Sequence, residues 1–171
     1  MVEGQWARTL ISKVIVVGCL PVVVHLFEAA QSRPPLMTEL NIPQGQNGLI
    51  RSAVFANHVG ILEYLLGQQD MKAHVRHRNA REENMLHLAS RFCNPTVFVK
   101  LVPLLLDCIH QRDMQGETVL DWIVGSGAAS GDRCEAASIL LAAMKPVFSE
   151  QQLETLGAAE LRRLMDSEGT S

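Results

Sequence analysis

The stretch that decides the fold is Asn84-Met-Leu-His-Leu-Ala89, which is answered downstream by Gly116-Glu-Thr-Val-Leu-Asp121. Both stretches predict a short helix that follows a tight turn. Leu86 and Ala89 are three residues apart, so they share one face of the first helix. In the second stretch the glycine favours a turn, and Thr118 is a residue type that caps a helix N-terminus. His87 has two ring nitrogens, so it can hydrogen-bond to two neighbouring loops.

These residues resemble the ankyrin repeat, whose first helix carries a Thr-Pro-Leu-His-x-Ala signature after a turn. The residues that match this turn and helix start are Leu86, His87 and Ala89 in one copy and Asp113, Gly116, Thr118 and Leu120 in the other. Met85 and Val119 stand where the family has proline, and Asp121 stands where it has histidine. The resemblance therefore depends on whether the pattern repeats along the chain.

Equivalent starts recur at Thr9, Gly48, Asn84 and Thr118, which are 39, 36 and 34 residues apart. This spacing is close to the roughly 33 residues of an ankyrin repeat. Each start is followed by a second apolar segment that predicts a helix, over residues 21–27, 59–66, 95–102 and 134–141. The resemblance implies an all-α fold, an ankyrin-repeat solenoid of stacked helix-turn-helix units with hairpin-like connecting loops.

Length and composition fit one such domain. The chain has 171 residues, of which 47% are hydrophobic and 5% aromatic, so aliphatic side chains must fill the core between stacked helix pairs. We expect a single domain over residues 1–165, with repeats at about 5–40, 44–79, 80–113 and 114–145, a helical cap at 146–165 and a flexible tail at 166–171.

Local signals refine these boundaries. Residues 32–47 are expected to form the longest connector of the first half because they are rich in proline and turn residues. Pro103 should end or kink its helix at Val102. Asp132 and Glu135 are expected to cap the last long helix. In the helical cap expected at 146–165, Ser149 and Gln152 have capping-box spacing, and Gly157 should end the helix that they start.

The apolar run 11–27 permits a second interpretation, as a signal peptide or a membrane span. Against this, the run contains Lys13 and His25 and is shorter than the roughly 20 apolar residues that a span needs. Pro21 would break a membrane helix, but it suits the first turn of a second repeat helix. We therefore expect a terminal repeat here and no membrane partner.

A search for chemistry returns no catalytic residues, no metal site and no cofactor. Cys19, Cys93, Cys108 and Cys134 form no Cys-x-x-Cys pair and are interpreted as free thiols in a reducing compartment. A zinc site built from Cys93, Cys108, His87 and His110 is the alternative. The glycine-rich run 125–131 lacks the ending of a phosphate-binding loop and is expected to lengthen a turn.

Charge gives no drive toward nucleic acid, since the formal net charge is −3. Basic residues crowd into the connector at 67–83, namely Lys72, His74, Arg76, His77, Arg78 and Arg81. They are offset by Glu82 and Glu83, and no aromatic residues interleave them to stack on bases. We expect a solvated loop, with phosphate binding as the alternative.

If the chain catalyses no reaction, its function should lie in a binding surface. In the ankyrin family, the hairpin tips and the first-helix face line a concave groove that binds proteins. The matching positions here are expected to be exposed and include a run of large apolar residues, Phe55, Leu88, Phe92 and Trp122, with Arg51, Arg81 and Arg91 giving polar orientation around them. The alternative is that these side chains belong to the core.

The sequence therefore predicts a non-enzymatic protein–protein interaction module that binds a partner protein through this groove, as an adaptor, inhibitor or effector. An IκB-like inhibitor of a transcription factor is one alternative, and a regulatory or substrate-docking domain of a larger enzyme is another. We expect a monomer or weak dimer that binds another protein and no nucleic acid. The expected location is the cytoplasm or nucleus, with delivery into a host cell as an option.

Overall fold

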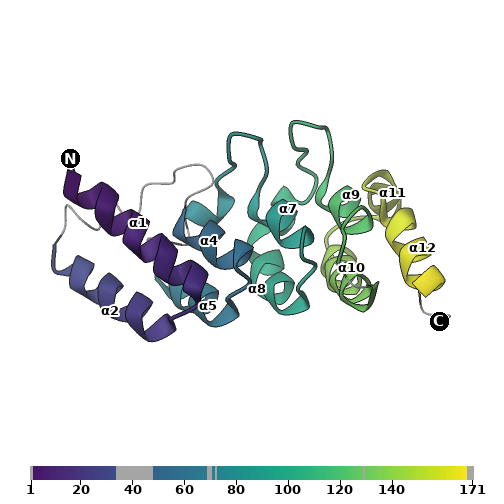
Figure 1. The fold of residues 1–171 in the computed structure, drawn as a ribbon. Coiled ribbons are helices and arrows are strands. Elements are labelled where there is room, and N and C mark those ends of the chain that lie inside the picture. Colours follow the sequence, from purple (N-terminus) through teal and green to yellow (C-terminus); the bar gives the residue numbers. More distant parts are fainter. Residues whose placement is uncertain (1, 34–47, 69–70, 72, 129, 169–171) are drawn as a thin grey trace. The chain divides into compact units, whose positions relative to one another are not determined.

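The computed structural model describes residues 2–33, 48–68, 71, 73–128 and 130–168, and for residues 2–9, Ala73, Ser130, Ser167 and Glu168 the backbone alone. Every regular element in these residues is a helix, and none of them is a strand (Figure 1). The all-α prediction is therefore confirmed. Residues 34–47 of the connector expected at 32–47, and Lys72 of the basic run, lie outside the described residues.

The chain divides into two compact units, Met1–Ala80 and Arg81–Ser171. The first unit contains α1 (Val2–Val17), α2 (Leu20–Gln31), α4 (Leu49–Phe55), α5 (Val59–Gly67) and the 3₁₀ helix η2 (Ala73–Arg76). Here α1 packs against α4 and α2 packs against α5 (Figure 1). The fully buried side chains between these helices include Ile15, Phe27, Leu49, Ile61 and Leu65.

The second unit contains α7 (Met85–Ser90), α8 (Pro95–Leu105), the 3₁₀ helix η3 (Leu106–Cys108), α9 (Val119–Val124), α10 (Ser130–Met144), α11 (Glu150–Thr155) and α12 (Ala158–Glu168). The same arrangement recurs, since α7 packs against α9, α8 against α10, and α12 against both α9 and α10. Leu86, Phe98, Leu101, Leu105 and Ile109 are fully buried in this core.

Three of the four expected first-helix starts are confirmed. Gly48, Asn84 and Thr118 are each the N-cap residue of the helix that follows. Ser149 likewise caps α11 through a capping box with Gln152. The start expected at Thr9 is wrong, because α1 begins at Val2 and runs through that position.

The turns within the first three helix pairs share one backbone feature. Gly18, Asn57 and Cys93 all have a positive φ, of 85°, 58° and 47°. Each one is followed by the N-cap residue of the second helix, which is Cys19, His58 or Asn94. The steps between the three turn residues are 39 and 36, the same as those between the predicted repeat starts.

Gly18 is the turn residue most sensitive to substitution. A Cβ added there would lie 2.5 Å from Cε1 of His58, and His58 is held by the contact of its Nε2 with the carbonyl of Val16 at 3.1 Å. We expect Gly18→Ala to lower the free energy of unfolding by about 2 kcal/mol, because the positive φ and the crowding both oppose a side chain. Chemical denaturation followed by circular dichroism measures the change.

Gly67→Ala is the matched control, since nothing lies within 4 Å of its added Cβ and its φ is not positive. It ends α5, so alanine there should be neutral or stabilising by up to about 1 kcal/mol. Equal losses of stability in the two variants would show that the Gly18 turn carries no special constraint.

Three local predictions need correction. Pro103 does not end its helix at Val102, because α8 continues to Leu105, and the kink expected there as the other outcome stays a prediction. The proline is on the exposed side of the helix, and the chain tightens into η3 only afterwards. Asp132 does not cap α10, which begins at Ser130, but lies in its first turn, where a negative charge suits the helix dipole. The tail expected from Asp166 begins later, since α12 extends to Glu168.

The apolar N-terminal run is divided between two helices, α1 and α2, with Pro21 in the first turn of α2 as predicted. No described helix combines the length and apolar character needed to cross a membrane. All four cysteines are free thiols, as expected.

Candidate protein-binding surface

Asn84 connects the start of α7 to the end of η3 and the loop that follows it, within the second unit. Its side-chain oxygen accepts hydrogen bonds from the backbone N–H groups of Leu86 (3.0 Å) and His87 (3.1 Å). Its side-chain amide donates to the carbonyl of Cys108 (3.1 Å) and to Oε1 of Gln111 (3.2 Å). Because Asn84 is fully buried, these bonds replace the water that its polar groups lose on folding.

His87 joins the same helix to the loop before α9. Its Nε2 lies 3.2 Å from the carbonyl oxygen of Glu117 and donates to it. Its Nδ1 faces the backbone N–H of Asn84 at 3.3 Å and the side-chain oxygen of Asn84 at 2.9 Å. The prediction that both ring nitrogens of His87 tie neighbouring segments together is therefore confirmed.

The loop before α9 is folded around Asp113. One carboxylate oxygen accepts from the backbone N–H groups of Gln115 and Glu117, both at 2.9 Å, and the other accepts from Nε1 of Trp122 at 3.0 Å. The backbone N–H of Asp113 donates back to the Glu117 carbonyl, giving a hairpin-like turn. The carboxylate thus fixes the loop and the indole of Trp122 together.

Burial raises the pKa of Asp113. The hydrogen bonds from Glu117, Trp122 and Gln115, together with the nearby His87, lower it by a larger amount, so the pKa of the folded state lies below the ordinary 3.8. The ionised carboxylate therefore stabilises the fold above about pH 3.8, and this contribution is lost as the pH falls through the lower pKa of the folded state.

Asp113→Asn tests this charge. We expect it to lower the free energy of unfolding at pH 7 by about 1.5–3 kcal/mol, because hydrogen bonds to a charged acceptor are lost. The difference from the unsubstituted chain should shrink below pH 3.8, the ordinary pKa of the group. Denaturant titrations between pH 7 and pH 3 measure it. A difference that stays constant with pH would contradict the role of the ionised carboxylate.

Trp122 is half-buried and is held on three sides. Besides its bond to Asp113, its ring lies edge-on to the His87 ring, with centroids 5.8 Å apart, and the guanidinium of Arg91 lies 5.3 Å from its centroid. Phe92, the next residue after Arg91, is exposed. We call Arg91, Phe92 and Trp122 the Trp122 surface. It is an aromatic and cationic surface at the side of α7 and α9.

The other expected contact residues divide into exposed and buried groups. Phe55 is exposed but belongs to the first unit, and Arg81 is exposed in the second. The expected exposure of Leu88 and Arg51 is wrong, since their exposed fractions are 5% and 4%. Both lie on short helices packed on two sides: α7 contacts α8 and α9, and α4 contacts α1 and α5. Too little helix surface is left for these positions to reach solvent.

Two features of this surface were missing from the sequence-based prediction. The Asp113–Trp122 bond joins residues nine apart across a loop, and no spacing rule predicts it. Met114, at the tip of the same loop, is one of the most exposed large apolar residues of the described chain. An exposed methionine between Asp113 and the turn glycine is the sequence signal of an apolar loop tip.

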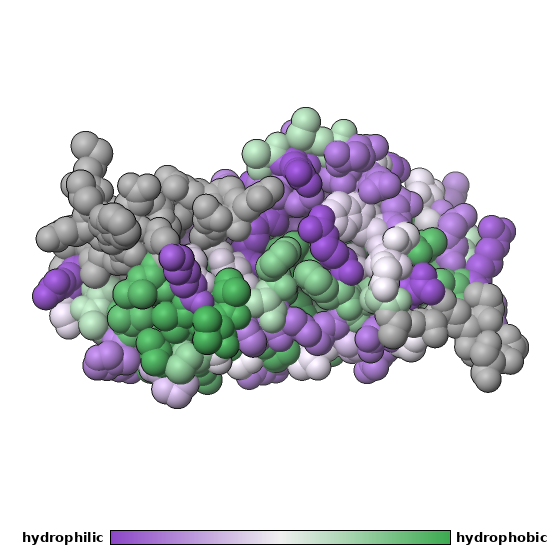
Figure 2. All heavy atoms as spheres, in the orientation of Figure 1, coloured by the Kyte–Doolittle hydropathy of each residue, from purple (hydrophilic) through white to green (hydrophobic). Residues whose placement is uncertain are grey.

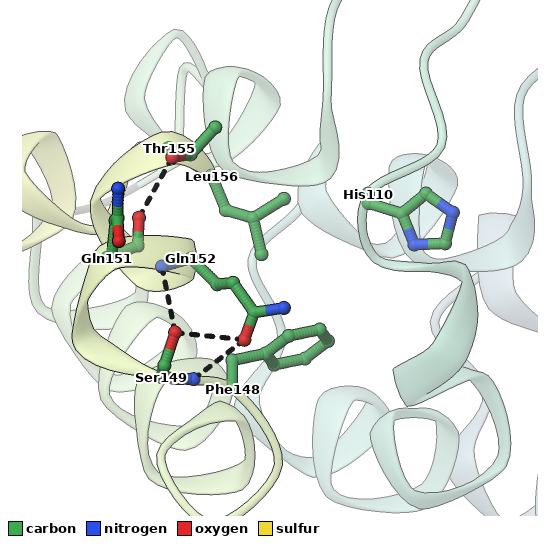
Figure 3. A pocket seen from close by; sticks show the side chains of 7 residues that line it. All are labelled: His110, Phe148, Ser149, Gln151, Gln152, Thr155 and Leu156. Carbon is green, nitrogen blue, oxygen red and sulfur yellow. Dashed lines mark hydrogen bonds between the residues drawn. The ribbon is translucent and has the colours of Figure 1, made fainter.

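A shallow hollow lies elsewhere in the second unit (Figure 3). It has a volume of about 450 Å³ and is lined by His110, Phe148, Ser149, Gln151, Gln152, Thr155 and Leu156. Ser149 and Gln152 are already bonded to each other in the capping box, and Thr155 donates to the carbonyl of Gln151. These polar groups are thus committed to the helix, and His110 faces no activated nucleophile among the lining residues (Figure 3).

Metal binding has no candidate among the described side chains, where no three or more His, Cys, Asp or Glu residues gather at a common point. In comparisons with known proteins, no family model, curated protein or solved structure matches the chain. The arguments for its function therefore come from its own residues.

Proposed function

We propose that the chain is a non-enzymatic protein-binding module whose helix pairs are ankyrin-like repeats. The recurrence of the capped first helices at Gly48, Asn84 and Thr118 supports this. So does the positive-φ residue two positions before the second helix in the first three pairs, at Gly18, Asn57 and Cys93. The His87 bridge to the next loop gives a physical reason for the histidine of the signature, because it links one repeat to the following one.

The observation that carries the binding role is the fixed Trp122 indole with the Arg91 guanidinium over its ring. Tryptophan and arginine dominate the binding energy at protein interfaces when they are held in place before binding. Asp113 and His87 hold the indole, so little conformational entropy is lost when a partner covers it. The exposed Phe92 adds apolar area next to this pair. The partner is another protein, and the exposed Arg81 of the same unit is a further contact. The exposed Phe55 of the first unit stays a predicted contact.

Affinity capture from a cell lysate tests the proposal. The triple variant Phe55→Ala, Phe92→Ala, Trp122→Ala should lose the captured partner while its circular dichroism spectrum stays helical. Since Trp122→Ala also removes the bond to Asp113, the variant Arg91→Ala, Phe92→Ala tests the surface without loosening the loop. Val99→Ala, an exposed apolar residue on α8, is the matched control. Undiminished capture by both surface variants would contradict the proposal.

A further inference from the structure

His87 is a buried titratable side chain, and both of its ring nitrogens face an oxygen atom. Its exposed fraction is 0%. Nε2 lies 3.2 Å from the carbonyl oxygen of Glu117, and Nδ1 lies 2.9 Å from the side-chain oxygen of Asn84. A neutral imidazole carries one N–H and can donate to only one of these oxygens, whereas the imidazolium carries two and can donate to both.

The orientation of the Asn84 amide is fixed by its other hydrogen bonds. Oδ1 accepts from the backbone N–H groups of Leu86 and His87, and the amide nitrogen donates to the Cys108 carbonyl. Turning the amide over would place its nitrogen against two N–H groups and its oxygen against a carbonyl, so three bonds oppose that change. The atom 2.9 Å from Nδ1 is therefore an acceptor, which cannot donate to the ring.

Nδ1 has a second neighbour, the backbone N–H of Asn84, at 3.3 Å. The two contacts exclude each other as hydrogen bonds, because an unprotonated Nδ1 accepts from this N–H and a protonated Nδ1 donates to Oδ1. The contact with Oδ1 has the usual length of an N–H···O hydrogen bond, and the contact with the N–H is longer than that range. In a neutral ring, two lone pairs would oppose each other across the shorter contact. The distances therefore favour the protonated Nδ1.

Charged groups around the ring decide whether this buried site can hold the second proton. Burial opposes a charged ring. The Asp113 carboxylate favours it, because the attraction by which His87 lowers the pKa of Asp113 acts equally on the ring. Figure 2 shows hydrophilic residues gathered over the loop before α9, where water screens the exposed charges. The other titratable or charged residues on the neighbouring elements are Glu83 and Arg91 beside α7, Lys100 on α8, Cys108 on η3, Arg112 and Glu117 in the loop, and Asp121 on α9.

We propose that His87 is protonated on both ring nitrogens in the folded chain at and slightly above neutral pH, and that loss of the second proton is a switch that loosens the start of α7. The deprotonated ring can keep its bond to Glu117, but it loses the one to Asn84. This switch concerns the fold of the second unit and does not depend on the partner-binding role.

The direction of the pH dependence follows from linkage. In the unfolded chain a histidine has its ordinary pKa of about 6.5. If the folded chain holds the second proton more firmly, the stabilisation by the charged ring is complete below about pH 6.5 and is lost as the pH rises above it. The unfolding equilibrium constant should then increase by up to about tenfold per pH unit in this range, for one proton released on unfolding.

Nitrogen-15 NMR of the histidine rings in the full chain at about pH 7.5 tests the proposal, since an ordinary histidine is mostly neutral there. The His87 ring is identified by its through-space contact with the Trp122 indole. Both of its nitrogens should give the shifts of N–H groups. One unprotonated nitrogen in this ring would overturn the proposal.

Asn84→Ser tests the role of the side-chain oxygen. A serine hydroxyl can still cap α7 and can also donate to Nδ1, so the ring should lose its second proton at a lower pH than in the unsubstituted chain. Loss of the proton at the same pH in both would overturn the assignment of this proton to the bond with Oδ1 of Asn84.

Denaturant titrations between about pH 6 and pH 8 test the effect on stability. The unsubstituted chain should lose stability relative to His87→Gln as the pH rises, because glutamine has no proton to release. His110→Gln, the same exchange at an exposed histidine of the second unit, is the control. Parallel pH curves for the unsubstituted chain and His87→Gln, or equal effects of the two exchanges, would contradict the switch. If His87→Gln does not fold, the ring signals of the unsubstituted chain and of Asn84→Ser decide.

Discussion

Asn84→Ala is expected to lower the free energy of unfolding by about 3 kcal/mol. The substitution removes a helix N-cap, which costs about 1 kcal/mol. It also removes the hydrogen bonds of the side-chain amide to the Cys108 carbonyl and to Oε1 of Gln111, each of which adds roughly 0.5–1.5 kcal/mol. The Cys108 carbonyl keeps its hydrogen bond from the backbone N–H of Gln111. Chemical denaturation followed by circular dichroism gives the change, and hydrogen exchange shows where it acts. The amides of α7 and of the loop around Gln111 should lose protection first.

Ser149→Ala is the control for this prediction. Ser149 caps α11 in the same capping-box geometry, but its bonds are exposed and reach no other part of the unit. Its loss should cost about 1 kcal/mol or less. Similar costs for the two caps would mean that the Asn84 bonds to Cys108 and Gln111 add nothing to the stability of the second unit.

Phe27→Ala should destabilise the chain by about 3–5 kcal/mol, through a cavity in the first unit. Phe27 is fully buried and packs against Tyr64 across the contact between α2 and α5. Because the surrounding helices are short, they have few other apolar groups with which to fill the space. Denaturation followed by circular dichroism measures the loss. The fluorescence of Tyr64, the chain's single tyrosine, reports the change at the site itself.

Phe55→Ala makes the same chemical change on the surface of the same unit, since Phe55 is 53% exposed. It should change the free energy of unfolding by about 0.5 kcal/mol or less. A loss at Phe27 no larger than the loss at Phe55 would contradict the packing of α2 on α5.

The sequence was informative where a local rule decides the structure. Asn84, Thr118 and Ser149 cap helices because a short polar side chain can reach the free N–H groups of the first turn. Gly18 and Gly157 occur where φ is positive. These signals predicted most helix starts and the helix pairs, and they predicted that His87 would join two segments.

The sequence was less informative where packing between elements decides. Leu88 lies at a position predicted to be exposed, but α7 has six residues and contacts α8 on one side and α9 on another. Arg51 is buried for the same kind of reason in α4. The bond of Asp113 to Trp122 depends on how the loop folds back toward α9. Thr9 was wrongly predicted to start a helix. α1 begins about two turns earlier, at Val2, and no stop signal lies between the two residues.

The most direct test of the binding role is the affinity of the chain for its captured, purified partner, measured by isothermal titration calorimetry. If the Trp122 surface is the binding site, Arg91→Ala, Phe92→Ala should weaken binding by about 100-fold, as for two residues at the centre of an interface, while Val99→Ala changes it little. Binding by Arg91→Ala, Phe92→Ala within about twofold of the unsubstituted chain, well inside the effect of one such residue, would contradict it.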